Sequence, residues 1–127
     1  MLVTPYYNKP TQRGLIEHYK AIANSVDIPQ ILYNVPSRTG VDIENTTVIE
    51  LSNIPNIVGI KDATGDISRI KYLKDKVNPE LSFISGDDLT FMEFLEAGGD
   101  GVISVTANIK PSEIHQICSL ISNKNFE

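Results

Sequence analysis

Ile57-Val58-Gly59-Ile60-Lys61 is the stretch of sequence that decides the fold. Its continuous apolar run is typical of a β-strand that is buried on both faces. Side chains alternate along a strand, so we expect Ile57, Gly59 and Lys61 to point to one face. Val58 and Ile60 then point to the other face. The run ends in a lysine, which is an unusual residue at the end of a buried strand.

Similar apolar, β-branched runs recur on both sides of this stretch. We predict strands over residues 2–7, 30–35, 56–61, 82–86 and 101–106. Apolar residues at helical spacing predict a helix after each strand: Leu15, Tyr19, Ile22, Ala23 and Val26; Val48, Ile49 and Leu51; Ile67, Ile70, Leu73 and Val77; Phe91, Met92, Phe94 and Leu95; Ile114, Ile117, Cys118 and Ile121. Thr11 and Asp66 are candidate N-caps of the first and third helices.

This alternation predicts an α/β fold with a parallel sheet covered by helices. Two architectures satisfy it. One is an open, doubly wound sheet of five strands, which fits a chain of 127 residues. The other is a part of a (β/α)8 barrel, whose complete form needs about 250 residues. Periodicity alone does not choose between them.

Composition excludes several classes of function. The net charge is −5 without a basic stripe, so we expect no nucleic-acid partner. No apolar run approaches the roughly 20 residues of a membrane helix, and no signal peptide is visible, so we expect a cytoplasmic protein without membrane contact. Cys118 is the only cysteine, which rules out a disulfide within the chain. His18 and His115 stand alone, so no metal site is predicted.

The position of Lys61 suggests chemistry. In a barrel this lysine faces the interior at the carboxyl end of its strand, where barrel enzymes carry catalytic groups. An ammonium group shielded from water loses its proton more easily. The neutral amine then attacks carbonyl carbons and forms a Schiff base. We expect Gly59, one step below, to leave room for the lysine stem. The alternative is a lysine that merely begins a solvent-facing loop.

Tyr33 and Arg38 follow the same logic on the preceding strand. Carboxyl ends of neighbouring parallel strands meet at one edge, so we expect Tyr33 near Lys61. A tyrosine hydroxyl there can transfer protons. Arg38 offers a planar fork that suits a carboxylate. The alternatives are a core tyrosine and a surface arginine. Asp87-Asp88 is predicted to cap the fourth helix rather than to bind a metal.

Several motifs together resemble one family. Tyr33–Pro36 followed by Gly59–Gly65 resembles the signature of the dihydrodipicolinate synthase and N-acetylneuraminate lyase superfamily. Val3–Asn8 resembles the fourth strand of that barrel, Ser85–Asp88 the end of the seventh, and Gly101–Val105 the eighth. The resemblance implies a partial (β/α)8 barrel of about five βα units. Residues 1–127 then form one incomplete barrel domain, without the family's first three βα units and its C-terminal helical region.

Ser37-Arg38-Thr39-Gly40 points to the dihydrodipicolinate synthase branch. That resemblance implies a class I aldolase that condenses pyruvate with aspartate semialdehyde in lysine and diaminopimelate biosynthesis. It implies that Lys61 forms the imine, Tyr33 moves protons and Arg38 holds the semialdehyde carboxylate. No metal or organic cofactor is implied, because the lysine itself is the electron sink. Asp62 stands where glutamate is most frequent in the family.

The resemblance assigns further positions. Tyr7 matches a tyrosine that crosses a subunit interface into the neighbour's proton relay, and Tyr6 matches the family's lysine feedback site. The backbone at Gly86 and Ile103 is implied to line the pyruvate pocket. A homo-oligomer, the family tetramer, or a partner segment that completes the barrel is also implied. A threonine pair of the proton relay belongs to the missing units, so we expect the isolated chain to be inactive.

Two other functions stay open. An N-acetylneuraminate or keto-deoxy sugar acid aldolase shares Lys61 and Tyr33 but has less use for Arg38. A non-catalytic half-barrel that self-associates through its unpaired edges needs none of these residues.

Overall fold

A computed structural model describes residues 1–123 as one sheet with helices on one side. The strands are β1 (Leu2–Val3), β2 (Gln30–Asn34), β3 (Ile57–Asp62), β4 (Ser82–Ser85) and β5 (Gly101–Val102). The helices are α1 (Gln12–Ser25), α2 (Pro36–Thr39), α3 (Asn45–Leu51), α4 (Ile67–Leu73), α5 (Phe91–Glu96), α6 (Pro111–Ser122) and a 3-10 turn (Thr106–Asn108). None of the helices within 1–123 is both long and apolar enough to cross a membrane.

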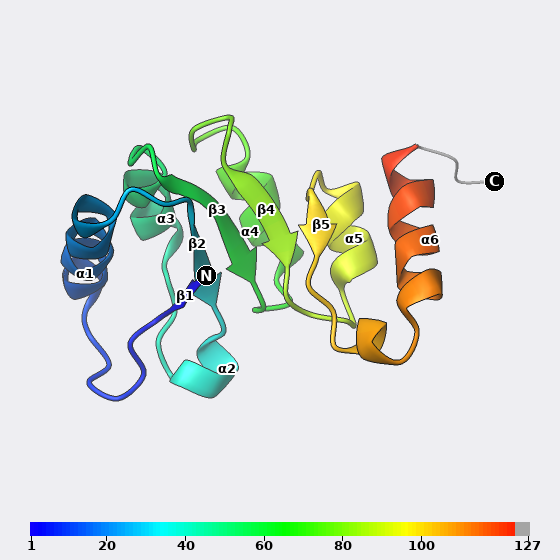
Figure 1. The fold of residues 1–127 in the computed structure, drawn as a ribbon, viewed down its shortest axis with the longest axis horizontal. Helices are drawn as coiled ribbons and strands as arrows, with labels where there is room; N and C mark the ends of the chain where they lie inside the picture. The colour runs from blue at the N-terminus through cyan, green and yellow to red at the C-terminus, as the bar shows by residue number, and fades with distance from the viewer. Residues whose placement is uncertain (124–127) are drawn as a thin grey trace.

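The order of the strands decides between the two architectures. All five strands are parallel and lie in the order β1-β2-β3-β4-β5. In Figure 1 the arrows of β2, β3 and β4 point to the same end of the molecule, where α2 and the 3-10 turn also lie. A doubly wound sheet reverses its strand order at a switch point, whereas a barrel wall does not. The predicted fold class, a partial (β/α)8 barrel of about five βα units, is therefore confirmed.

One hydrophobic core lies between the sheet and the helices. Its fully buried members come from α1, α3, α4, the strands and the loop before α3: Leu15, Tyr19, Leu32, Ile43, Val48, Leu51, Ile60 and Ile70. Successive helices pack on each other, α1 on α3, α3 on α4 and α4 on α5. The predicted caps are confirmed, because the Thr11 side chain accepts from the Gly14 amide and Asp66 accepts from the Ser68 amide.

The strand register separates two faces of the sheet. Leu32, Ile60 and Phe83 pair across β2, β3 and β4 and belong to the core under the helices. The next row, Tyr33 and Lys61, therefore lies on the opposite face. The predicted orientation of Lys61 against Ile60 is thus correct.

The predicted side of Ile57 is wrong. Gln30 pairs with Ile57, but Ile31 pairs with Gly59, so Val58 is an extra residue at a register shift. A β-bulge of this kind breaks the simple alternation of side chains. As a result Ile57 packs in the helix-side core and does not share the face of Lys61.

The edge strands are shorter than predicted. β1 ends at Val3, although we expected a strand to residue 7. The pairing with β2 ends at Val3 and Tyr33, beyond which the Thr4 amide still donates to the Tyr33 carbonyl at 3.4 Å. An unpredicted short helix, α2, also follows β2, with Pro36 in its first turn.

β5 ends at Val102 rather than at residue 106. The Asp88 carboxylate accepts from the Thr106 amide and hydroxyl, both at 2.8 Å, which holds Thr106 in a 3-10 turn. The predicted capping role of Asp87-Asp88 is accordingly wrong. The Asp87 carboxylate instead accepts from the amide and the hydroxyl of Thr90. Thr90 is the N-cap residue of α5, and its side chain makes no capping hydrogen bond.

Candidate active site

Lys61 and Tyr33 meet on the sheet face that the helices do not cover. The two residues are register partners on β3 and β2. The Lys61 Nζ lies 4.2 Å from the centre of the Tyr33 ring. This distance is typical of a cation–π contact. Only 7% of Lys61 is exposed, so its amine is held in a fixed place near a phenol.

Gly86 makes the space for the Lys61 stem. A Cβ added at Gly86 would lie 2.7 Å from Lys61 Cε and 2.9 Å from Ala63 Cβ. Both distances are below van der Waals contact, so no larger residue fits without movement of the lysine. The predicted role of Gly59 is wrong, because a Cβ there would meet Ser82 and Ile31 instead. The Gly86 amide donates to the Asp62 carbonyl at 2.7 Å, which extends the sheet past β4.

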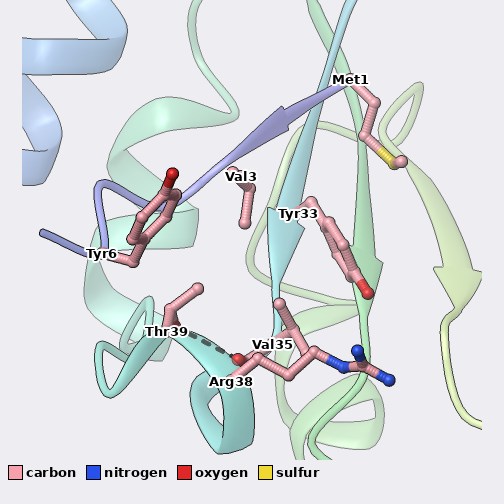
Figure 2. Close-up of a pocket in the computed structure, with 7 residues that line it drawn as sticks. All are labelled: Met1, Val3, Tyr6, Tyr33, Val35, Arg38 and Thr39. Carbon is pink, nitrogen blue, oxygen red and sulfur yellow. Dashed lines mark hydrogen bonds between the residues drawn. The ribbon is translucent and has the colours of Figure 1, made fainter.

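A cavity of about 550 Å³ opens beside Tyr33. Its lining is mainly apolar and comes from β1, β2, α2 and residues next to them in the chain: Met1, Val3, Tyr6, Tyr33, Val35, Arg38 and Thr39. Figure 2 shows the Tyr33 phenol and the Arg38 guanidinium projecting to the same side of β2, with Tyr6 across the cavity from them. Such a pocket suits a small ligand that carries a carboxylate.

The local sequence after β2 places Arg38. Pro36 begins α2, where its missing N–H is no loss. Gly40 ends the helix with φ +64° and donates its amide to the Pro36 carbonyl. The Thr39 hydroxyl donates to the Val35 carbonyl at 3.2 Å, as the dashed line in Figure 2 shows. This single turn directs Arg38 back toward the cavity.

The other predicted site residues are less closely gathered. Tyr6 lines the cavity, but Tyr7 is 95% exposed and does not line it. Ile103 is 44% exposed beyond the end of β5, where its amide donates to the Ser85 carbonyl. Lys61, Tyr33 and Gly86 thus form one cluster. Arg38 and Tyr6 join it through the cavity, while Tyr7 and Ile103 stand apart.

Sequence reasoning missed a polar cluster on the helix-facing side of the same strands. Asn34 and Asp62 follow Tyr33 and Lys61 and are both buried. Their side chains contact Asp42 and Arg69. The sequence feature that could have revealed this cluster is a polar residue at the last position of each of two neighbouring buried strands. Within residues 1–123, no three His, Cys, Asp or Glu side chains gather as a metal ion would require.

Comparison with known proteins identifies the family of the chain. Residues 1–127 match the model of the Dihydrodipicolinate synthetase family over their whole length. The chain belongs to the dihydrodipicolinate synthetase family. The resemblance deduced from the motifs around Tyr33 and Lys61 is therefore confirmed.

Individual members of the dihydrodipicolinate synthetase family are close in sequence. The 4-hydroxy-tetrahydrodipicolinate synthase of Buchnera aphidicola subsp. Baizongia pistaciae is 56% identical over 127 residues, which are 100% of this chain and 43% of that protein. The synthase of Thioalkalivibrio sulfidiphilus is 61% identical over 118 residues, 93% of this chain and 40% of that protein. This chain thus spans less than half the length of these relatives.

Solved structures of the family share the fold. The dihydrodipicolinate synthase from Acinetobacter baumannii, solved in complex with pyruvate, superposes with a TM-score of 0.93 at 58% identity. The match covers 98% of this chain and 43% of that one. The synthase from Aquifex aeolicus also gives a TM-score of 0.93, at 43% identity, with coverage of 98% and 43%.

Proposed function

We propose that this chain is the Schiff-base-forming part of a synthase that condenses pyruvate with aspartate semialdehyde in lysine and diaminopimelate biosynthesis. The observation that carries the proposal is the buried Lys61 amine 4.2 Å from the Tyr33 ring on the uncovered face of the sheet. Family membership supports it, since the relatives are named as 4-hydroxy-tetrahydrodipicolinate synthases.

Lys61 is the nucleophile in this proposal. Its Nζ attacks the ketone carbon of pyruvate, a C–N bond forms, and the ketone oxygen leaves as water. Loss of a methyl proton converts the imine to an enamine, whose carbon bonds to the aldehyde carbon. The amino group of the semialdehyde then attacks the imine carbon, and the Lys61 amine leaves.

Tyr33 and Arg38 serve the two ends of the reaction. The Tyr33 hydroxyl transfers protons while water and the lysine amine depart. The Arg38 guanidinium pairs with the carboxylate of the semialdehyde across the cavity. Arg38 at this position favours the condensation over sugar acid cleavage, which is the second candidate. The backbone near Gly86 and Ile103 lines the pyruvate side. Tyr7 joins the proton relay of a neighbouring subunit, and Tyr6 belongs to a site for feedback inhibition by lysine.

We further propose that the active form contains more of the barrel than residues 1–127. The chain corresponds to 43% of the length of a pyruvate-bound relative. β1 and β5 are the edges of the sheet, each with one strand neighbour among the described residues. Further strands or another subunit paired there would enclose the Lys61 side of the sheet.

Borohydride trapping tests the proposal. The purified chain is incubated with pyruvate and sodium borohydride, and the adduct is located by mass spectrometry of peptides. We expect a reduced pyruvate adduct on Lys61 and none in Lys61→Arg, while Lys74→Arg is trapped like the wild type. An adduct on another lysine, or full trapping in Lys61→Arg, contradicts the role of Lys61. No adduct from a folded chain shows that this polypeptide is not an enzyme by itself.

A substrate panel, applied to an assembly that contains the rest of the barrel, then separates the two aldolase functions. Condensation with aspartate semialdehyde supports the proposal. Release of pyruvate from N-acetylneuraminate or a keto-deoxy sugar acid, without condensation, supports the second candidate. Arg38→Ala is expected to weaken the condensation and to leave pyruvate trapping nearly unchanged.

A further inference from the structure

The sheet carries a polar cluster directly behind the Lys61–Tyr33 pair, in which Asn34 and Asp62 are buried and the Asp42 side chain is 37% exposed. Its members are Asn34 on β2, Asp62 on β3, Asp42 before α3 and Arg69 on α4. Asn34 and Asp62 are register partners, as Tyr33 and Lys61 are one step earlier. Successive residues of a strand point to opposite faces. Tyr33 and Lys61 therefore point to the uncovered face of the sheet. Their chain neighbours Asn34 and Asp62 point to the helix side.

Asn34 is fully bonded inside this cluster. Its Nδ2 donates to Asp42 Oδ1 at 2.7 Å and to Asp62 Oδ2 at 3.3 Å. Its Oδ1 accepts from the Ile43 amide at 3.0 Å. None of the Asn34 side chain is exposed to solvent. A fully satisfied buried amide of this kind tolerates only one arrangement of its neighbours.

Arg69 links the two carboxylates from α4. Its Nη1 donates to Asp42 Oδ2 at 3.0 Å, and its Nη2 donates to the Ile43 carbonyl at 2.5 Å. Its Nε lies 3.2 Å from Asp62 Oδ2 without the alignment of a hydrogen bond, so that contact is electrostatic. The guanidinium therefore occupies a fixed position between β3 and the loop before α3.

Asp62 connects the cluster to the loop after β3. Its Oδ1 accepts from the Thr64 amide at 2.9 Å and the Thr64 hydroxyl at 2.5 Å. This holds the turn that contains Ala63, whose Cβ lies against Gly86 near the Lys61 stem. The two carboxylate oxygens of Asp62 therefore have different partners: Oδ1 holds the turn after β3, and Oδ2 faces Asn34 and Arg69.

We propose that Asn34, Asp42, Asp62 and Arg69 are positioning residues that fix Lys61 against Tyr33 from the opposite face of the sheet. The cluster acts through the backbone of β2 and β3 and touches no substrate. The effect of the cluster on the reaction of Lys61 with pyruvate rests on the proposed function. Its effect on the Lys61–Tyr33 contact is independent of that function.

Proton NMR measures that contact without any reaction. The ε-methylene protons of Lys61 lie near the Tyr33 ring, whose ring current shifts their signal; Tyr33→Leu supplies the unshifted reference. We expect Arg69→Gln and Asp62→Asn to move the signal most of the way to that reference. Arg69→Lys, which keeps the charge but loses the fork, is expected to give an intermediate shift. Glu50→Gln is the matched control, because it breaks a surface ion pair with Lys20 at 2.6 Å.

The outcomes separate the inference from the proposed function. If folded Arg69→Gln and Asp62→Asn keep the wild-type Lys61 signal, the positioning role is overturned. If Arg69→Gln does not fold, Asp62→Asn and Arg69→Lys decide by the same signal. Where the wild type forms a pyruvate adduct, these variants should slow its formation on the order of 100-fold, as expected of a misplaced reacting group. A wild type without an adduct counts against the proposed function and leaves the NMR result valid.

Discussion

The Lys61 Nζ lies over the Tyr33 ring, 4.2 Å from its centre, although the two residues are 28 positions apart in sequence. The contact exists because β2 and β3 are parallel neighbours whose register pairs Tyr33 with Lys61. It brings an amine and a phenol together at the end of the sheet where the strands stop. Substitution of Tyr33 can remove its hydroxyl alone or its ring together with the hydroxyl.

Tyr33→Phe should keep the contact but lose proton transfer. The ring remains over Lys61, so the free energy of unfolding should change by less than about 1 kcal/mol. The rate of imine formation should fall by roughly 10²–10⁴-fold, the usual contribution of a general acid–base. Tyr33→Leu should in addition cost about 1 kcal/mol of stability through the lost cation–π contact. Urea unfolding and the rate of borohydride trapping measure the two effects. Equal trapping rates for Tyr33→Phe and the wild type would remove the proton-transfer role.

Gly86→Ala should displace the lysine. The added methyl would lie 2.7 Å from Lys61 Cε, and overpacking of this kind costs about 1–3 kcal/mol. Trapping of pyruvate on Lys61 should fall at the same time. Gly101→Ala is the matched control, since nothing lies within 4 Å of its Cβ position. A Gly86→Ala chain as stable and as reactive as Gly101→Ala would refute the steric argument.

Gln30→Met should stabilise the chain. Gln30 is 3% exposed, and neither amide atom has a hydrogen-bond partner among residues 1–123. Replacing an unsatisfied buried amide by an apolar chain of similar shape should raise the free energy of unfolding by about 1–2 kcal/mol. Asn34→Leu, on the same strand and face, should lower it, because Asn34 is fully bonded. Chemical unfolding compares the two, and a destabilised Gln30→Met would reveal a buried water bound to the amide.

The Cys118 thiol should react slowly in the folded chain. Burial on α6 raises the pKa of the Cys118 thiol. At a given pH the folded chain therefore holds less thiolate, the reactive form, than the unfolded chain. The pH dependence of alkylation by iodoacetamide should shift to higher pH in the folded chain relative to the chain in urea. Coincident curves would show that the helix does not shield the thiol.

The buried strands were predictable because their apolar runs are long and strong. β2 and β3 differ from the predicted ranges by a single residue at their ends, and the pairing of Tyr33 with Lys61 follows from parallel topology. The edge strands were not predictable at their ends. Where β1 stops depends on how far it pairs with β2, and where β5 stops depends on Asp88, 18 residues from Thr106.

Which glycine makes room for the Lys61 side chain was also decided by the tertiary structure. Gly59 and Gly86 are equally plausible as space for a lysine when only the sequence is read. The register shift at Val58 and the approach of the loop after β4 assign that role to Gly86. The cluster of Asn34, Asp42, Asp62 and Arg69 also escapes sequence reasoning, because its members come from four separate segments.

The sequence by itself determined the family, the alternation of strands and helices, and the lysine and tyrosine at the ends of two adjacent strands. Those features are local: they depend on apolar periodicity, caps and short motifs. Only the tertiary structure decided the bulge at Val58, the steric role of Gly86 and the polar cluster behind the Lys61–Tyr33 pair. These features depend on contacts between residues distant in the chain, whose distances are set only when the sheet and helices pack.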